Sequence, residues 1–272
     1  MARREGVPRF HVAVIGPGAL GTFFAARLSK VVPTALIGRH FPDKTEAEWV
    51  IVLVKAYDTA AALRSARRMK PAGIVSLQNG LIEGVPQGVT TAAAYRQGRR
   101  VVPVATGTTL LPRGFEVLAG YLRKAGFDAR VVADIGAARL GKLLANVCLN
   151  PLTALFRVRN AEIARPPYAA FAQALAAEAA PVLAAEGLAI TPRSAFRRVM
   201  QVAQATAGNR SSMLQDVLAG RRTENEHLTG ALLRLARRHR LSVPTHAAFY
   251  RLICVMEPQV ESSGQLRRRT IR

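Results

Sequence analysis

The chain has few of the residues that build disulfide-rich or metal-bound folds. It holds two cysteines in 272 residues, Cys148 and Cys254, and each stands alone in an apolar, helix-like segment. A disulfide framework or a zinc site needs several cysteines or histidines at short spacings, so neither is expected. His227 and His246 also lack the spacing of metal ligands. The sequence therefore predicts no metal site.

Long apolar runs are scarce as well. No apolar stretch is expected to reach the length of a membrane span, and only the short basic segment 1–6 precedes the first apolar run, without the pattern of a secretory signal. Half of the residues are hydrophobic, which excludes a disordered chain. We therefore expect a soluble cytoplasmic protein with no membrane partner.

Acidic residues are few. The chain has 17 Asp and Glu against 39 Lys and Arg, a net charge of +22. Such a balance ordinarily suggests nucleic-acid binding. However, the arginines are spread over several predicted helices, and aromatic residues make up only 6% of the chain, so few are available to stack on bases. We interpret the charge as a solvated surface that favours anionic cofactors and substrates, and expect no specific nucleic-acid partner.

A glycine-rich turn is the strongest positive signal. The apolar run 11–15 leads directly into Gly16-Pro17-Gly18-Ala19-Leu20-Gly21, and the helix-like segment 22–28 follows. In this context the three glycines allow a tight turn, the close approach of a diphosphate, and close packing of the helix on the strand. The free N–H groups at the start of the helix can bind phosphate oxygens. The pattern predicts dinucleotide binding by residues 16–21; a purely structural turn is the alternative.

The residue after the second apolar run indicates which dinucleotide. That run, residues 34–38, is followed by Arg39. Enzymes that prefer NAD usually carry an acidic residue here, which binds the ribose 2′-hydroxyl. A guanidinium instead suits a 2′-phosphate, which it can bind through two hydrogen bonds. The sequence favours NADP over NAD, and the alternative is a solvated arginine at a strand end.

The first part of the chain alternates strand-like and helix-like segments. Beyond the runs already named, strands are predicted at 50–54, 73–77, 101–104 and 129–132, and helices at 59–69 and 114–124. This alternation argues for a parallel sheet covered on both faces. Only nine residues separate Arg39 from Trp49, too few for a crossover helix and another strand. The sheet should be trimmed there, or the connection is a plain loop.

The pattern changes after residue 133. The later segments 137–149, 168–186, 192–207, 212–219, 223–240 and 245–257 are rich in alanine and leucine, and no strand pattern appears among them. The sequence thus predicts an α/β fold: an N-terminal Rossmann-type domain with a trimmed parallel sheet, residues 1–133, followed by an all-α domain, residues 134–272. Residues from Pro258 onward lose their periodicity and are expected to fray.

Polar residues follow two strands of the predicted sheet. Lys55 stands after the strand 50–54, and Gln78-Asn79-Gly80 follows the strand 73–77. Ligands of open α/β sheets collect outside the carboxyl ends of the strands. Lys55 and Asn79 are therefore candidate cofactor contacts, although polar residues at strand ends are also ordinary turn formers.

A stripe of polar residues marks one helix of the second domain. Lys142, Asn146 and Asn150 are spaced by four residues, which places one ammonium and two carboxamides on the same helix face. The positions between them are apolar. Asparagine is a poor helix former, so using it twice in mid-helix needs compensation. We predict that this stripe lines a site; the alternative is the wet face of an amphipathic helix.

Two further segments have both a structural and a functional interpretation. Ser212 and Gln215 match a capping box that opens a helix, while the same exposed N–H groups and hydroxyl could hold a carboxylate. Glu224 would be a first-turn glutamate stabilised by the helix dipole. It would gain a role in proton delivery only if it approaches Lys142.

Taken together, these motifs resemble the ketopantoate reductase family over roughly residues 9–257. The resemblance rests on six motifs in the family's order: 16–21, 54–57, 78–80, 142–146 with 150–154, 211–216 and 223–224. It implies NADPH-dependent reduction of the 2-keto group of ketopantoate, a small 2-keto acid, to pantoate, on the way to pantothenate and coenzyme A. Two departures are the shortened segment 39–49 and a tryptophan, frequent in the family just before the lysine, that is replaced within 138–141.

The resemblance also implies roles for individual residues. Lys142 matches the catalytic lysine that donates a proton to the carbonyl oxygen. The positions that match substrate contacts are Asn146, Asn150, Asn160 and Ser212. The positions that match cofactor contacts are Gly16, Pro17, Gly18, Ala19, Leu20, Gly21, Arg39, Lys55, Asn79, Ala94 and Glu224. A reductase of another branched 2-keto acid, or an NADP-binding protein without turnover, remains an alternative. The sequence leaves open whether the protein is a homodimer.

Overall fold

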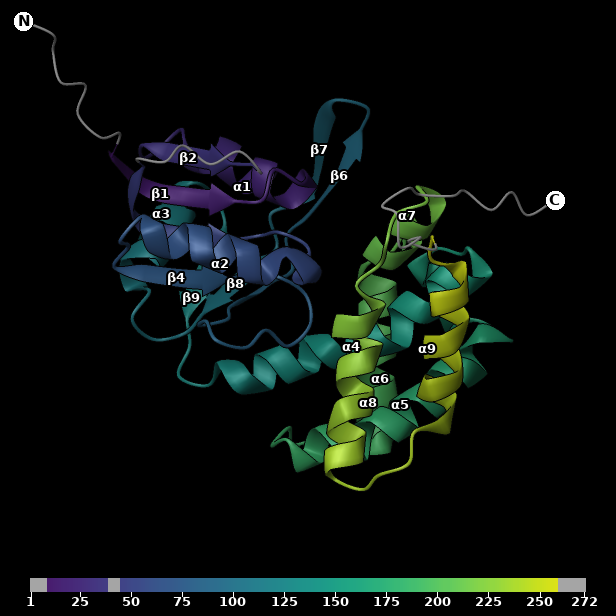
Figure 1. Cartoon of the computed structure of the whole chain (residues 1–272). Helices are drawn as coiled ribbons and strands as arrows, with labels where there is room; N and C mark the ends of the chain where they lie inside the picture. Colours follow the sequence, from purple (N-terminus) through teal and green to yellow (C-terminus); the bar gives the residue numbers. More distant parts are fainter. Residues whose placement is uncertain (1–8, 39–44, 259–272) are drawn as a thin grey trace, which may run out of the picture. The chain divides into compact units, whose positions relative to one another are not determined.

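The computed structural model describes residues 9–38 and 45–258 (Figure 1). Arg39 lies outside the described residues, and so does the predicted fray except for Pro258. The chain divides into two compact units, Met1–Ala138 (unit 1) and Arg139–Arg272 (unit 2). The border lies inside helix α4, Ile135–Phe156. Residue 133, where the composition changes, comes just before this helix.

The main sheet of unit 1 is parallel, as the alternating pattern predicts. Strands β1 (Arg9–Ile15), β2 (Thr34–Ile37), β3 (Glu46–Val52) and β4 (Gly73–Ser76) lie in the order β2-β1-β3-β4, and every pair is parallel. No helix or strand separates β2 from β3 among the described residues, in line with the short connection expected after β2. The strands therefore end at one edge of the sheet, where the residues that follow them gather.

Helices cover both faces of this sheet. Helices α1 (Ala19–Leu28) and α3 (Glu116–Lys124) share one buried cluster with Val12 and Val14, whereas helix α2 (Thr59–Arg68) shares another with Ala13 and Ile15. Alternate residues of a strand face opposite sides. Burial on both faces explains why these strands are continuous apolar runs rather than alternating ones.

A glycine allows the aromatic packing at the start of β4. A Cβ on Gly73 would lie 2.6 Å from Cζ3 of Trp49. The Trp49 ring in turn packs against Phe115, with centroids 5.5 Å apart. Trp49 is 8% exposed. The indole thus joins β3, β4 and the start of α3 in one cluster.

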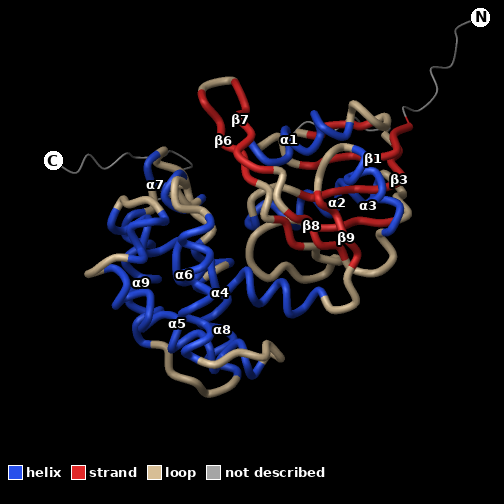
Figure 2. The backbone as a smooth tube through the Cα atoms, turned by 180° about the vertical axis from the view of Figure 1, so that it is seen from behind, coloured by secondary structure: helices blue, strands red, loops and turns tan. Residues whose placement is uncertain are grey.

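Residues 89–111 depart from the predicted parallel pattern. The expected strand 101–104 is β7 (Arg100–Ala105), which pairs antiparallel with β6 (Ala93–Gln97), and the two form a hairpin that projects from unit 1 (Figure 2). A second sheet has the order β5-β8-β9 and contains an antiparallel pair. Its strands are β5 (Val89–Thr90), β8 (Thr108–Leu111) and β9 (Asp128–Val131). Strand β8 pairs parallel with β9, so the prediction of a parallel arrangement is wrong for β5, β6 and β7 only.

Unit 2 is built from helices, and its described residues include no strand. The elements after α4 are η2 (Asn160–Ala164), α5 (Tyr168–Ala185), α6 (Pro192–Ala205), α7 (Ser212–Leu218), η3 (Asn225–His227), α8 (Thr229–Arg238) and α9 (Pro244–Met256). The segment predicted as one helix, 223–240, is thus split into η3 and α8. Helix α4 continues to Phe156 through Pro151, beyond the predicted end at residue 149.

Helix α5 corrects one expectation about apolar runs. By length and composition alone it could cross a membrane, the one such helix among the described residues. In unit 2 it packs against α6, α8 and α9. The residues it buries are Ala172, Leu175, Ala176, Ala179, Ala180, Val182 and Leu183. Its apolar composition is accounted for by this position in the helical core.

Candidate functional site

The turn between β1 and α1 requires glycine at two positions. Gly16 has φ +120°, and a Cβ there would lie 2.6 Å from the Leu53 carbonyl carbon. At Gly21 a Cβ would lie 1.9 Å from the Gly16 carbonyl oxygen. These close approaches bring the start of α1 onto the ends of β1 and β3. The first and third glycines thus have the roles predicted for a dinucleotide-binding turn.

The middle glycine leaves space above the turn. Gly18 is the N-cap of α1 and is exposed, and a Cβ there would meet no atom within 4 Å. Ala19 and Leu20 form the first turn of the helix, whose N–H groups have no partners within the helix. An open space beside such N–H groups suits a phosphate. The residues present therefore fit the diphosphate of a dinucleotide.

The ends of β3 and β4 are tied together by glutamine side chains. Gln78 Nε2 donates to the Val54 carbonyl at 2.9 Å and to Thr59 Oγ1 at 2.8 Å. Gln87 Nε2 donates to the Gly80 carbonyl at 2.7 Å. These bonds fix the two loops that carry Lys55 and Asn79, both half-buried. Sequence reasoning missed Gln87, because nothing in its surroundings marks it.

Other cofactor candidates of unit 1 lie in less regular places. Ala94 belongs to β6 and packs, half-buried, against the main core cluster. Arg39 lies outside the described residues, so its prediction stays untested.

The polar stripe of α4 exists as predicted. Lys142 and Asn146 are half-buried, Asn150 is buried, and the apolar positions between them are buried. Burial lowers the pKa of the Lys142 ammonium to about 8, while the negative charge of Glu224 opposes that shift. Glu224, also in unit 2, is 5% exposed and precedes η3 rather than standing in a first helical turn. The carboxylate of Glu224 is thus close enough to influence the charge of Lys142, and its role in proton delivery stays a prediction.

The cap of α7 is not the residue that the sequence pattern suggested. Ser211 is the N-cap, and its Oγ accepts from the Leu214 N–H at 3.1 Å. Thr153 Oγ1 of α4 donates to the same Ser211 Oγ at 2.6 Å, so the start of α7 is joined to the helix that carries the stripe. Ser212 is half-buried, and its hydroxyl is not used in the cap. The capping-box prediction for Ser212 and Gln215 is therefore wrong by one position.

Asn160 is fixed at one end of its carboxamide only. Its Nδ2 donates to Thr206 Oγ1 at 2.8 Å, and its backbone N–H donates to the Asn209 carbonyl. Its Oδ1 is buried and accepts no hydrogen bond from any described residue. A buried acceptor without a donor is costly, which suits a position that receives a hydroxyl from a ligand.

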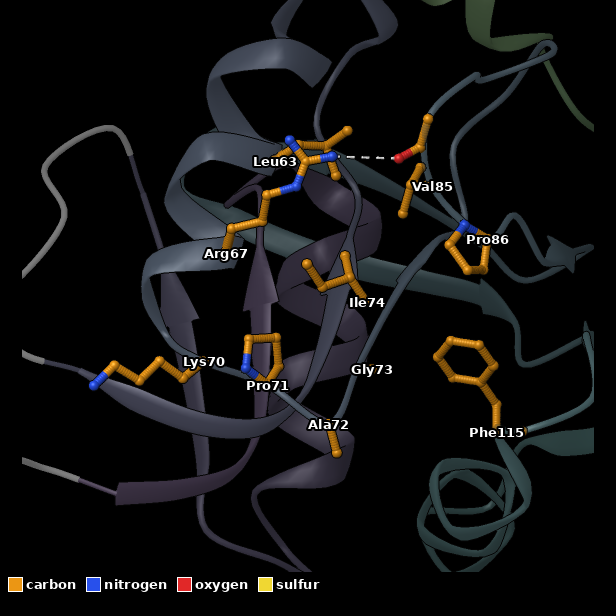
Figure 3. A pocket seen from close by; sticks show the side chains of 12 residues that line it. Leu63, Arg67, Lys70, Pro71, Ala72, Gly73, Ile74, Val85, Pro86 and Phe115 are labelled. Atoms are coloured by element: carbon orange, nitrogen blue, oxygen red, sulfur yellow. Dashed lines mark hydrogen bonds between the residues drawn. The ribbon is translucent and has the colours of Figure 1, made fainter.

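A pocket elsewhere in unit 1 contains none of these candidates. It lies at the end of α2 and the start of β4, with Ile74, Pro86 and Phe115 on its walls (Figure 3). Arg67 closes one side by donating to the Gly84 carbonyl at 3.4 Å. The pocket lies where β4 begins, at the amino ends of the parallel strands, whereas the glycine turn lies at their carboxyl ends. We do not assign the predicted chemistry to it.

Two family models match the chain. The model described as "Ketopantoate reductase PanE/ApbA" matches residues 29–111, and that for the C-terminal part of the same family matches residues 134–257. The 2-dehydropantoate 2-reductase of Yersinia pestis is 35% identical over 236 residues, 80% of this chain and 77% of that protein. That of Pyrobaculum aerophilum is 32% identical over 275 residues, 90% of this chain and 97% of that protein.

Solved structures show the same fold at lower sequence identity. A dimeric ketopantoate reductase from Staphylococcus aureus aligns with a TM-score of 0.79 and 24% identity, over 90% of this chain and 98% of that one. A D-mandelate dehydrogenase in complex with NADH and anilino(oxo)acetate aligns with a TM-score of 0.79 and 19% identity, over 90% and 97%. These likenesses establish the fold.

Proposed function

The chain belongs to the ketopantoate reductase family, and from this we propose that it reduces the 2-keto group of 2-dehydropantoate to give pantoate, with NADPH as the hydride donor. The observation that carries the proposal is the state of Lys142. An ammonium with a pKa of about 8 shares one helix face with two asparagines, and a pKa near the working pH suits a general acid.

Unit 1 would hold the cofactor. Residues 16–21 offer backbone N–H groups and the open space over Gly18 to the diphosphate. Lys55 and Asn79 stand after the fixed ends of β3 and β4, where cofactors of such sheets bind. When bound, the reduced nicotinamide supplies the hydride that reaches C2 of the keto acid.

Lys142 would supply the proton. As negative charge develops on the carbonyl oxygen, the ammonium donates its proton to that oxygen and stabilises the charge until the transfer is complete. Glu224 would keep enough of the lysine protonated near neutral pH, because its carboxylate opposes the effect of burial on the pKa.

The remaining candidates would position the substrate. Asn160 would accept a hydrogen bond from the substrate hydroxyl at its unpartnered Oδ1. Asn146 and Asn150 extend the face that carries Lys142. Ser212 would donate its hydroxyl to the carboxylate, since Ser211 already provides the cap. A 2-keto acid with both a hydroxyl and a carboxylate fits this set of groups.

The test of the proposal is NADPH oxidation at neutral pH with 2-dehydropantoate and several branched 2-keto acids that lack the hydroxyl. We expect the highest kcat/KM for 2-dehydropantoate. A preference for another keto acid would reassign the substrate. NADPH binding without turnover of any of these acids would contradict the enzymatic proposal.

The charge on Glu224 predicts a change in pH dependence. Because reduction needs protonated Lys142, kcat/KM should fall as the pH rises through about 8. Glu224→Gln removes the carboxylate that raises the lysine pKa, so the fall should begin at lower pH. The measurement is a pH profile of kcat/KM beside that of Glu83→Gln, an exposed glutamate of unit 1. Identical profiles would exclude the proposed coupling.

Arg39 should decide between the two dinucleotides. Arg39→Ala removes the guanidinium proposed to bind the 2′-phosphate, and a charge-assisted bond of this kind contributes about 1.5–3 kcal/mol. We expect the Kd for NADPH to rise on the order of 10- to 100-fold while the Kd for NADH stays nearly constant. Fluorescence titration with both cofactors measures the two values, and equal losses would refute the assignment.

A further inference from the structure

We propose that Arg96 of the β6–β7 hairpin is a phosphate ligand of the cofactor, which binds the diphosphate beside the glycine turn. The inference rests on the proposed binding of NADPH and adds a residue that the sequence motifs did not indicate. It begins with one contact: Arg96 Nη2 donates to the carbonyl oxygen of Pro17 at 2.7 Å. Pro17 stands between the first two glycines of the turn, 79 positions away along the chain.

The hairpin holds Arg96 on the side that faces α1. Side chains two residues apart on a strand share a face, so Ala94 and Arg96 lie together and Tyr95 lies opposite. Ala94 packs against the core cluster that includes α1, whereas Tyr95 is 40% exposed. Strand β6 also packs against α1. The direction of Arg96 therefore follows from the strand, not from a chance rotamer of a surface side chain.

The contact with Pro17 leaves most of the guanidinium available. An arginine has five N–H donors in a planar fork that matches phosphate oxygens, and the hydrogen bond to Pro17 uses one of them. No ion pair joins Arg96 to a carboxylate in the described part of the chain, and its side chain is exposed. A neutral carbonyl orients the cation without cancelling its charge.

The space beside this cation is the one prepared for phosphate. Gly18 directly follows Pro17, and a Cβ on it would meet nothing within 4 Å. The guanidinium is thus held at the rim of the open space that the N–H groups at the start of α1 border. Backbone N–H groups would donate to the diphosphate, and Arg96 would add a full positive charge beside them.

Equilibrium binding of NADPH to the whole chain tests the inference, with Arg96→Ala, Arg96→Lys and the matched control Arg99→Ala from the same hairpin. Arg99 is exposed in the hairpin turn. We expect the Kd for NADPH to rise on the order of 10- to 100-fold in Arg96→Ala, by less in Arg96→Lys, and not at all in Arg99→Ala. The melting temperature of Arg96→Ala should match that of the wild type.

A second probe separates phosphate binding from simple attachment of the hairpin. Adenosine 2′-monophosphate carries the adenosine half of NADPH without the diphosphate, so its Kd should stay within twofold in Arg96→Ala. An unchanged Kd for NADPH, or equal losses for both probes, would overturn the assignment of Arg96. A wild-type chain that binds no NADPH would instead refute the proposed function itself.

Discussion

Lys142→Ala should lower kcat for 2-dehydropantoate reduction on the order of 10²- to 10⁴-fold, the range that general acid catalysis contributes. The ammonium is proposed to act on the carbonyl oxygen, and no other lysine lies on the α4 face that carries Asn146 and Asn150. The Kd for NADPH should change little, because the proposed diphosphate site belongs to unit 1. Steady-state kinetics and cofactor titration separate the two effects.

Two further variants distinguish a loss of catalysis from a loss of folding. Lys142→Met keeps the apolar stem of the side chain in its half-buried place and should lose activity to a similar extent with a melting temperature close to that of the wild type. Lys124→Ala removes an exposed lysine at the end of α3 and should be fully active. Near-normal turnover in Lys142→Met would remove Lys142 from its proposed role.

Gly21→Ala should cause the largest loss of stability of any single methyl addition in the glycine turn. The new Cβ would lie 1.9 Å from the Gly16 carbonyl oxygen and 3.1 Å from its carbon. Both are backbone atoms of the strand end, so α1 must move away from β1. Overpacking of this kind costs about 3 kcal/mol, or roughly 10 °C in the melting temperature of unit 1. Cofactor affinity should fall with it.

Gly18→Ala is the matched control, with the opposite balance of effects. Its φ of −67° is accessible to alanine, and its Cβ would meet no protein atom within 4 Å. The variant should therefore melt within a few degrees of the wild type, yet its methyl group would occupy the proposed phosphate space and weaken NADPH binding. Thermal melts and NADPH titrations of both variants test the pair. A wild-type melting temperature for Gly21→Ala would contradict the close approach of α1 to β1.

Local signals made much of the fold predictable. The main strands are buried on both faces, so each is a short, continuous apolar run that differs clearly from the segments around it. Gly16 and Gly21 were predictable because steric limits on the backbone allow no other residue in such a turn. The α4 stripe was predictable because Lys142, Asn146 and Asn150 follow the helical period while apolar residues fill the positions between them.

Long-range contacts account for what was missed. The hairpin pairs Ala93–Gln97 with Arg100–Ala105. The second strand was predicted from its apolar run 101–104, but the first lies largely at the surface and is not apolar enough to stand out, so the antiparallel pairing was missed. Its turn contains Gly98 with φ +58°, a backbone conformation that favours glycine and is typical of hairpin turns. The cap of α7, Ser211 rather than Ser212, also accepts a hydrogen bond from Thr153, which lies 58 positions away. No local pattern encodes that choice.

The position of Trp49 allows the unfolding of the two units to be followed by different spectroscopic signals. It is the one tryptophan of the chain, and its ring is held between Gly73 and Phe115 in unit 1. Its emission will report only on the loosening of that unit, whereas far-ultraviolet circular dichroism will be dominated by the helices of unit 2. Recording both signals in one denaturant titration shows whether the two halves melt as a single cooperative block or in succession.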